Sequence, residues 1–472
     1  MLFTYENGVL GMEEIHRFSN DPVPVNGTLY WDVLRLWHEI RTALTKAVNQ
    51  GGFDAVGIDT WGVDFGLLDK RGDLVGNPVN YRDRRTVPMP EEVFKTVPQG
   101  EIYARTGIQF MHFNTLYQLY YLASREPEKL QNTEMLLQIP DLFAYFLTGV
   151  KKGERTNAST TNMLNPVTRE WDVELLEKLG IPSRVLPPLI DAGTVYGNLR
   201  PELCKELGLP EVPVIAVGTH DTASAVVAAP AEEADFVYIS CGTWSLFGTE
   251  SAVPVLTPES EAFNFTNEGG YAGTTRLLKN IMGLWLIQES RRQWKREGEE
   301  VSFNQLEQEA LASKPFQCFV DVDAPEFEGP GDLPGHVKAY CRRTGQHVPE
   351  TRGEVMRCIY ESLAMKYKYT FENLQKITGK HYHTIHILGG GIKDGLLCRM
   401  TADACGVPVK AGPAEATVTG NALVQLIALG EIGDLSEARK VVRDSTPLKV
   451  YTPSSPEEWD AHYGAFLKAI GR

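Results

Sequence analysis

Apolar residues follow two different spacings along this chain, helical in some blocks and strand-like in others, which predicts a mixed α/β fold. The segment 30–48 carries Val33, Trp37, Ile40, Leu44 and Val48 at helical spacing. A Gly-Gly pair follows directly and is a common stop for a helix. We therefore predict an amphipathic helix over this segment.

The next block, FDAVGIDTWGVDFGLLDKRGDLVG, is typical of two strands joined by a polar turn. The first strand is predicted to end at Asp59, and the second to begin at about Val63 and to turn back as a hairpin at Lys70 to Asp73. Farther on, IPDLFAYFLTGV and EWDVELLEKLGI indicate helices, and EVPVIAVGTHD indicates a strand. The segment ERTNASTTNML between them is rich in capping residues and small side chains.

The second half begins with a predicted hairpin over 236–249, followed by a predicted helix over LLKNIMGLWLIQ. A region rich in Pro, Gly and Asp, 324–335, is expected to be an exposed excursion, and a long helix is predicted over 352–378. The block from IHILGGG to GVPV then indicates strand, glycine turn, helix and strand. Both halves thus mix hairpins with helical crossovers, although no direct sequence repeat relates them.

Length and charge narrow the classes of function. A chain of 472 residues exceeds what one core usually organises, so we expect two domains, 1–228 and 229–472, with a cleft between them. The net charge of −15 disfavours binding to nucleic acid or to anionic lipid. No signal peptide or membrane span is visible in the sequence, which favours a cytoplasmic location. The seven cysteines contain no Cys-x-x-Cys pair, and we interpret them as buried free thiols.

The stretch VGTHDTASAV contains the strongest candidate for chemistry, Asp221. It follows an apolar strand and opens a helix of small residues, so it lies where open α/β sheets bind their ligands. An aspartate at such a junction is often only a helix cap, but the adjoining polar residues His220 and Thr222 favour a site. A carboxylate there can orient a sugar hydroxyl and accept its proton during phosphoryl transfer.

Two glycine turns in the second half are candidates for nucleotide contacts. In ISCGTWS, the backbone N–H groups of 240–243 and the hydroxyl of Thr243 can hold phosphate oxygens, although a simple β-turn explains the glycine equally well. The turn GGGIKDG departs from the dinucleotide-binding pattern GxGxxG. Its glycines are better suited to a close approach to adenine or ribose, with tight helix packing as the alternative.

The turn WGVD, with Trp61 and Gly62, suits a sugar contact and a core tryptophan equally well. The nearby pair Asp59 and Asp64 raises the possibility of glycoside hydrolysis. Nothing in the sequence around them indicates the shifted pKa values that this chemistry requires, so we do not favour it.

Seven motifs that occur in order identify a resemblance to the FGGY carbohydrate kinases: IDTWGVDF, NASTTNML, GTHDTASAV, CGTWSL, KNIMGLWLIQ, LGGG and EATVTGNAL. The likeness covers nearly the whole chain, and within the family it is to kinases that phosphorylate L-rhamnulose at its 1-hydroxyl with ATP. It implies an α/β fold of two actin-like, ribonuclease H-like ATPase domains with sugar and ATP meeting in the cleft. It also implies Mg²⁺ as cofactor with ATP.

The resemblance assigns roles motif by motif. Asp221 is similar to the catalytic base of the family. The residues similar to sugar contacts are Gly62, His220, Asp221, Thr222 and Asn280. The residues similar to ATP contacts are Thr243, Gln288 and Gly390. It assigns no magnesium ligand and no oligomeric state.

One family feature is not found in this sequence. Such kinases begin with a strand and a phosphate loop, whereas this chain starts at MLFTY, which resembles the strand after that loop. We expect that the natural start lies upstream of Met1. Because phosphoryl transfer relies on such backbone donors, two alternatives to a rhamnulose kinase stay open at this point: a kinase for another ketose, and a sugar- or nucleotide-binding protein with impaired turnover.

Overall fold

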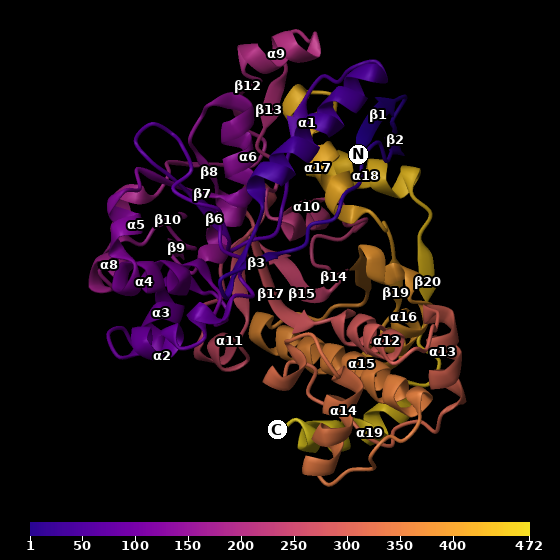
Figure 1. Cartoon of the computed structure of the whole chain (residues 1–472). Coiled ribbons are helices and arrows are strands. Elements are labelled where there is room, and N and C mark those ends of the chain that lie inside the picture. The colour runs from indigo at the N-terminus through magenta and orange to yellow at the C-terminus, as the bar shows by residue number, and fades with distance from the viewer. The chain divides into compact units, whose positions relative to one another are not determined.

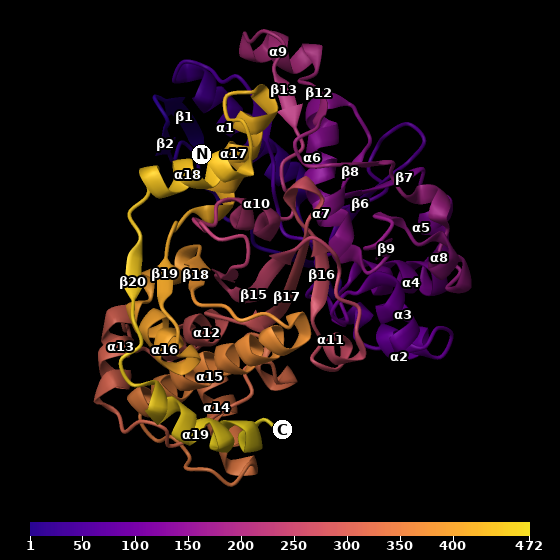
Figure 2. The same cartoon turned by 180° about the vertical axis from the view of Figure 1, so that it is seen from behind.

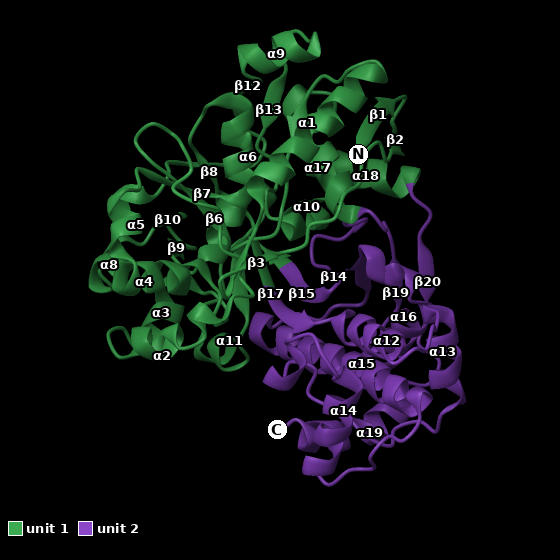
Figure 3. Ribbon diagram, viewed as in Figure 1, with its two compact units in different colours: residues 1–228, 250–277, 416–445 green, residues 229–249, 278–415, 446–472 purple.

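The computed structural model describes all residues 1–472, which group into two compact units (Figure 3). Unit 1 comprises residues 1–228, 250–277 and 416–445, and unit 2 comprises residues 229–249, 278–415 and 446–472. The chain therefore passes between the units several times, first after Ala228. The predicted division into domains 1–228 and 229–472 stays a prediction.

Unit 1 contains short strands and many short helices around several apolar clusters. Its strands are β1 (Leu2–Glu6), β2 (Val9–Glu13), β3 (Val23–Val25), β4 (Thr28–Tyr30), β5 (Val56–Gly57), β6 (Phe65–Leu68), β7 (Met135–Gln138), β8 (Gly153–Glu154), β9 (Leu164–Asn165), β10 (Glu170–Trp171), β11 (Leu189–Ile190), β12 (Val195–Asn198), β13 (Pro213–Ile215) and β16 (Thr266–Gly269). Its helices are α1 (Val33–Asn49), α2 (Met89–Phe94), α3 (Gln99–Thr106), α4 (Thr115–Arg125), α5 (Pro127–Gln131), α6 (Ile139–Thr148), α7 (Arg155–Ala158), α8 (Val173–Lys178), α9 (Pro201–Leu207), α10 (Asp221–Val227), α11 (Pro258–Ala262), α17 (Ala416–Leu429) and α18 (Leu435–Ser445), with short 3₁₀ turns at Arg84–Thr86, Ser159–Thr161, Ser183–Val185 and Tyr271–Gly273.

The first predicted helix is confirmed as α1. Asp32 caps it by accepting a hydrogen bond from the backbone N–H of Arg35, and the helix ends before the predicted glycine pair. Its apolar face contributes Leu44 to a core cluster that includes Leu147 of α6, Leu203 of α9 and Val214 of β13. The helices predicted over IPDLFAYFLTGV and EWDVELLEKLGI are present at 139–148 and 173–178, and the strand predicted over EVPVIAVGTHD is present at 213–215.

The predicted hairpin after Val63 is present but short. Asp69 N–H donates to the Asp73 carbonyl, Val75 N–H donates to the Leu67 carbonyl, and Leu74 forms an antiparallel bridge with Leu68. The returning chain soon meets the turn residues of GNP at 76–78, which end the pairing. Strand β6 also pairs with β7 in antiparallel register, which the sequence pattern did not predict.

Unit 2 is built around the largest sheet, in which the strand order is β16-β17-β15-β14-β18-β19-β20. Strand β16, the last residues of β15 and the first residues of β17 belong to unit 1. Figure 2 shows β18, β19 and β20 side by side. The strands are β14 (Val237–Cys241), β15 (Trp244–Ser251), β17 (Thr275–Met282), β18 (Ile385–Leu388), β19 (Val409–Ala411) and β20 (Lys449–Tyr451). The helices are α12 (Trp285–Arg296), α13 (Phe303–Ala312), α14 (Leu333–Arg343), α15 (Arg352–Thr378), α16 (Gly395–Cys405) and α19 (Pro456–Ala469), with 3₁₀ turns at Pro325–Phe327 (η5) and Gly390–Lys393 (η6).

The predicted helix over LLKNIMGLWLIQ is wrong in its first half. Leu277 to Met282 belong to β17, and α12 begins only at Trp285. All but one residue of β17 are buried, polar residues such as Arg276 and Lys279 included, so the strand shows no alternation of apolar and polar positions. Periodicity alone cannot separate such a strand from a buried helix.

Other predictions for the second half are confirmed. The hairpin β14–β15 is antiparallel, and α15 spans the predicted 352–378, with a capping box between Thr351 and Glu354. Helix α15 packs against α12, α13, α14 and α16 (Figure 1). Strands β18 and β19 are parallel and are joined through α16, as the glycine block predicts. The region 324–335 is only partly exposed, because Phe327 and Leu333 are buried.

None of the helices combines the length and the apolar character that crossing a bilayer requires.

Helix α10, which begins with Asp221, packs closely on α17 of the same unit. At the contact, a Cβ atom placed on Gly420 would lie 1.7 Å from the backbone carbonyl oxygen of Ser224. Only glycine permits this approach, because the clashing atom belongs to the backbone of α10 and cannot rotate away. The small residues of both helices therefore determine where α10 lies.

We expect Gly420→Ala to lower the apparent melting temperature, because overpacking of this kind costs about 1–3 kcal/mol or more. The matched control is Gly464→Ala in α19, where a Cβ meets nothing within 4 Å. That change should leave the melting temperature equal or higher, since alanine in a helix interior is favoured over glycine by about 0.5–1 kcal/mol. Thermal unfolding followed by circular dichroism measures both. Equal melting temperatures for the two variants would contradict the packing argument.

Candidate functional site

Asp221 lies where two parallel strands of unit 1 end. Strands β5 and β13 are parallel, and the loops after them are joined by backbone hydrogen bonds. Thr60 N–H donates to the Thr219 carbonyl at 3.0 Å, and Asp221 N–H donates to the Thr60 carbonyl at 2.9 Å. The predicted catalytic residue is thus placed at the carboxyl edge of a sheet, the usual position for a ligand site in this kind of fold.

The carboxylate of Asp221 is not a helix cap. The cap position of α10 is His220, whose side chain makes no capping bond, and Asp221 is the first helical residue. Its side chain is 45% exposed. Thr222 Oγ1 donates to Asp221 Oδ1 at 3.1 Å, and His220 Nε2 lies 3.5 Å from the same oxygen. This carboxylate is therefore both accessible and oriented by its two neighbours.

His220 is held by a buried ion pair that the sequence did not indicate. Arg276 Nη2 lies 3.1 Å from His220 Nδ1 and 3.2 Å from Glu268 Oε2, and the Arg276 side chain is fully buried. Because a guanidinium only donates, its contact requires an unprotonated Nδ1 and leaves the ring proton on Nε2, which faces Asp221. Glu268 Oε2 lies 3.2 Å from Nδ1 and could also accept a proton from it. In that case, however, the N–H of His220 would point at the N–H groups of the guanidinium, which is unfavourable. The ion pair thus favours the neutral tautomer that donates towards the base.

Glu154 fixes the other side of the same loop. This fully buried carboxylate accepts hydrogen bonds from Thr219 N–H (3.1 Å), Thr219 Oγ1 (2.8 Å) and Thr156 N–H (2.8 Å). Burial raises the pKa of Glu154 above its usual value. The side chain therefore connects the start of α7 to the residue two places before Asp221. The sequence signal was present, since Glu154 opens the stretch of capping residues noted above.

Gly62 lies close to the 3₁₀ turn Ser159–Thr161, because a Cβ on it would lie 2.7 Å from Thr160 Oγ1. Next to it, Asp64 is fully buried and accepts bonds from four N–H donors: the indoles of Trp31 and Trp61, the backbone of Tyr81 and the side chain of Gln118. Burial raises the pKa of Asp64 to about 6. Its oxygens are occupied by these donors, so its role is to hold Trp61, and the glycoside hydrolase arrangement gains no support.

Asp59 and Asn421 belong to the same unit as Asp221. Asn421 of α17 donates from its side-chain nitrogen to Asp59 Oδ2 and also to the Gly57 carbonyl. Burial, with a smaller contribution from the negative charge of Asp221, raises the pKa of Asp59 to about 7. Asn421 lies in the motif EATVTGNAL but was not predicted as a site residue, and Asp59 was considered only with Asp64 for glycoside hydrolysis.

Two of the residues predicted to contact ATP, Thr243 and Gly390, lie in turns at one edge of the unit 2 sheet, and the helix that carries Gln288 begins at the same edge. Strands β14 and β18 are parallel neighbours, with Ser240 opposite Leu388, so the turn with Thr243 and the turn with Gly390 leave the sheet on the same side. The Thr243 carbonyl accepts bonds from the N–H groups of Gly283 and Trp285, which attaches the first turn of α12, the helix of Gln288, to this edge.

The glycine turn itself is closely packed on β14. A Cβ on Gly391 would lie 2.3 Å from Cys241 Sγ, whereas a Cβ on Gly390 would meet nothing within 4 Å. Gly391 is thus required for packing, and Gly390 faces open space. The remaining predicted sugar contact, Asn280, lies on β17 in unit 2, whereas Gly62, His220, Asp221 and Thr222 lie in unit 1.

Comparison with known families gives a clear result. The model of the N-terminal domain of the FGGY family of carbohydrate kinases matches residues 3–228, and that of the C-terminal domain matches residues 237–429. This chain belongs to the FGGY family of carbohydrate kinases. It is therefore an ATP-dependent sugar kinase with ATP as co-substrate.

Curated members of the FGGY family are similar over almost the full length. The chain is 42% identical to a rhamnulokinase of Bacteroides thetaiotaomicron over 471 residues, which cover 100% of this chain and 96% of that protein. It is 43% identical to a rhamnulokinase of Bacillus subtilis over 455 residues, 96% of this chain and 92% of that protein.

Solved structures of FGGY kinases match the fold at low identity. A gluconate kinase from Lactobacillus acidophilus superposes with a TM-score of 0.81 at 18% identity, covering 98% of this chain and 93% of that one. A xylulose kinase from the same organism gives 0.79 at 17% identity, covering 96% and 91%. The glycerol kinase of Plasmodium falciparum gives 0.77 at 14%, covering 96% and 92%. The chain thus has the two-domain α/β fold of the FGGY kinases.

We expect Gly390→Val to raise the KM for ATP by about tenfold or more, equivalent to about 1.4 kcal/mol of lost binding, while the melting temperature stays unchanged. The added Cβ would occupy the open space beside the turn, since no protein atom lies within 4 Å of it. As a control, Gly391→Ala should lower the melting temperature because its Cβ overlaps Cys241 Sγ. Initial-rate kinetics with varied ATP give the KM. An unchanged KM in the valine variant would remove Gly390 from the nucleotide site.

Proposed function

We propose that this FGGY kinase phosphorylates L-rhamnulose at its 1-hydroxyl with ATP, in the breakdown of L-rhamnose. The observation that carries this proposal is the near-full-length identity of about 42% to several rhamnulokinases. The accessible Asp221 at a strand end, oriented by His220 and Thr222, supplies the base that the reaction needs. The protein is proposed to act in the cytoplasm.

In the proposed reaction, the sugar hydroxyl oxygen attacks the γ-phosphorus of ATP while its proton moves to the carboxylate of Asp221. The bond from the γ-phosphorus to the bridging oxygen breaks, and ADP leaves. His220 Nε2 lies 3.5 Å from Asp221 Oδ1, so His220 is proposed to orient the base and to contact the sugar. Gly62, Thr222 and Asn280 are proposed as further sugar contacts. A base positioned in this way contributes about 10²- to 10⁴-fold to the rate.

Thr243, Gln288 and Gly390 are proposed as the ATP contacts, because Thr243 and Gly390 lie in turns at one edge of the unit 2 sheet and the helix of Gln288 begins there. Mg²⁺ is proposed to arrive with ATP, and Asp59 offers the ligand type that this ion prefers. The raised pKa of Asp59 results from burial and from the negative charge of Asp221, and a cation beside it would offset both. When bound, the ion would neutralise charge on the phosphate oxygens.

Asp221→Asn should lower kcat for L-rhamnulose by about 100-fold or more, with the KM for the sugar changed little, because the amide keeps the shape but cannot accept the proton. The control is Asp54→Asn, which removes an exposed carboxylate from the same unit. ADP release in a coupled assay measures the rates, and circular dichroism confirms folding. An asparagine variant within about fivefold of the parent kcat would exclude Asp221 as the general base.

A panel of acceptors tests the substrate separately from the base. We expect kcat/KM for L-rhamnulose to exceed that for D-xylulose and glycerol by about 100-fold or more, because a site that hydrogen-bonds particular hydroxyls rejects compounds that lack them. The same ADP assay is used for all three. If D-xylulose were turned over as well as L-rhamnulose, the kinase activity would stand and the assignment of the sugar would be wrong.

A further inference from the structure

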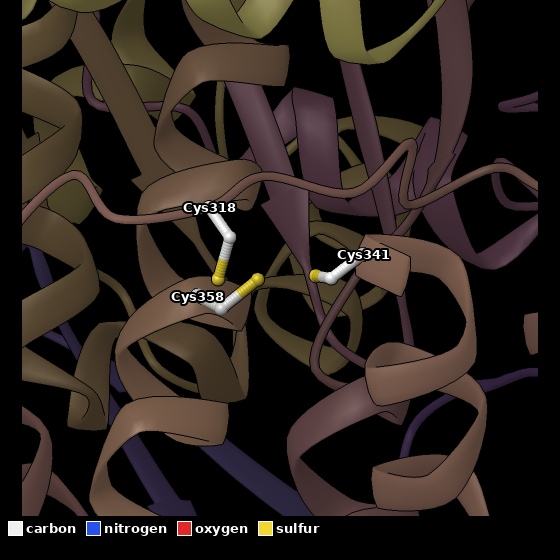
Figure 4. A group of neighbouring side chains, drawn as sticks. All are labelled: Cys318, Cys341 and Cys358. Carbon is white, nitrogen blue, oxygen red and sulfur yellow. The ribbon is translucent and has the colours of Figure 1, made fainter. Parts of the chain in front are cut away.

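Three of the seven cysteines come together inside unit 2. Cys318 lies in the segment between α13 and α14, Cys341 near the end of α14, and Cys358 in the second turn of α15. Their Sγ atoms all lie within 4.8 Å of one another, and Figure 4 shows the three side chains pointing towards a common point. Their exposed fractions are 3%, 0% and 2%. Spacing along the chain does not indicate this group, because its members are 23 and 17 positions apart.

The Cys318 segment is held in place by hydrogen bonds. On one side of the cysteine, Phe316 N–H donates to Glu361 Oε2 of α15 at 2.8 Å. On the other side, Val320 N–H donates to Ser362 Oγ at 2.9 Å. Between them, Gln346 accepts from the Phe319 N–H and donates to the Phe319 carbonyl, both at 2.8 Å. The three sulfur atoms are thus fixed by two helices and a clamped segment, without any help from a ligand.

Neither apolar packing nor a disulfide bond explains why three thiols converge on one point. A disulfide uses two sulfur atoms, leaves the third unused and requires an oxidant. Three sulfur atoms bonded at about 2.3 Å to one ion lie about 4 Å from each other, so the thiols would have to approach only slightly from their present separations of at most 4.8 Å. We propose that Cys318, Cys341 and Cys358 form a binding site for a thiophilic metal ion held by three thiolates, with Zn²⁺ as the ion that fits best.

Charge favours Zn²⁺ over Cu(I). The binding step is three thiols plus one Zn²⁺ giving a tris-thiolate zinc complex of net charge −1 and three protons. Cu(I) would leave a net charge of −2 in the same buried place, and burying uncompensated charge is costly. Mg²⁺ and Ca²⁺ prefer oxygen ligands and are not expected to bind. Because thiol ligands lose their protons when they bind a metal ion, the ion will bind more weakly as the pH falls.

The test uses the reduced, full-length protein, stripped with a chelator and titrated with Zn²⁺ in competition with a chromophoric indicator. We expect one equivalent of Zn²⁺ to bind and to raise the melting temperature, because the ion connects α14, α15 and the Cys318 segment. Cys358→Ser and Cys318→Ala should each weaken binding at least 100-fold and abolish the shift in melting temperature. The matched control, Cys405→Ser, changes a cysteine of the same unit outside the group and should behave as the parent.

Because Cys358 is in a long buried helix, Cys318→Ala in the clamped segment serves as the second variant if Cys358→Ser fails to fold. ADP release by each stripped variant, with no zinc added, confirms that it is folded. The stripped protein is also titrated with Cu(I). Binding of one equivalent of Cu(I) without binding of Zn²⁺ would support the three-thiolate site and assign a monovalent ion to it. No stoichiometric uptake of either ion, uptake unaffected by Cys318→Ala, or formation of a disulfide on mild oxidation in place of metal uptake would overturn the proposal.

Discussion

The close contact between α10 and α17 is the constraint on which the site depends. Asp221 is the first residue of α10, so any shift of this helix moves the carboxylate. Gly420 allows α17 to touch the Ser224 carbonyl, and Gly218 is similarly confined, since a Cβ there would lie 2.8 Å from the Ser224 backbone nitrogen. A helix of only seven residues has little stability of its own, so its position comes from these contacts.

The loop in front of α10 is fixed by charges buried at considerable cost. Glu154 and the Glu268–Arg276 pair are removed from water, and breaking such a buried pair typically costs about 3–5 kcal/mol. In return, Glu154 determines the conformation of Thr219, and Arg276 determines which nitrogen of His220 carries the proton. Neither apolar packing nor solvent could orient a proton acceptor as specifically as these hydrogen bonds do. Burial and hydrogen bonding here serve geometry more than stability.

Local pattern was enough to predict several parts of this structure. The amphipathic spacing around Trp37 predicted α1, the long run at 352–378 predicted α15, and the glycine block predicted the β18–α16–β19 unit. Asp221 was found because a polar cluster follows an apolar strand. Strand β17 was missed because burial on both faces removes the alternation that distinguishes a strand. Glu154, Arg276 and the three-cysteine group depend on contacts between residues far apart in the chain, which no local spacing reveals. The roles of the predicted site residues stay predictions.

The interleaving of the two units has a consequence for the order in which the protein can fold during synthesis. Unit 1 is made of three separate segments, the last of which is 416–445. Until that segment leaves the ribosome, α10 lacks its partner α17, Asp59 lacks Asn421, and the buried face of Ala223 and Val227 stays open to water. Nearly the whole chain must therefore be translated before the first unit can close. A nascent chain of this design depends on protection of that apolar face from the synthesis of α10 until segment 416–445 emerges, in contrast to proteins whose domains fold one after another.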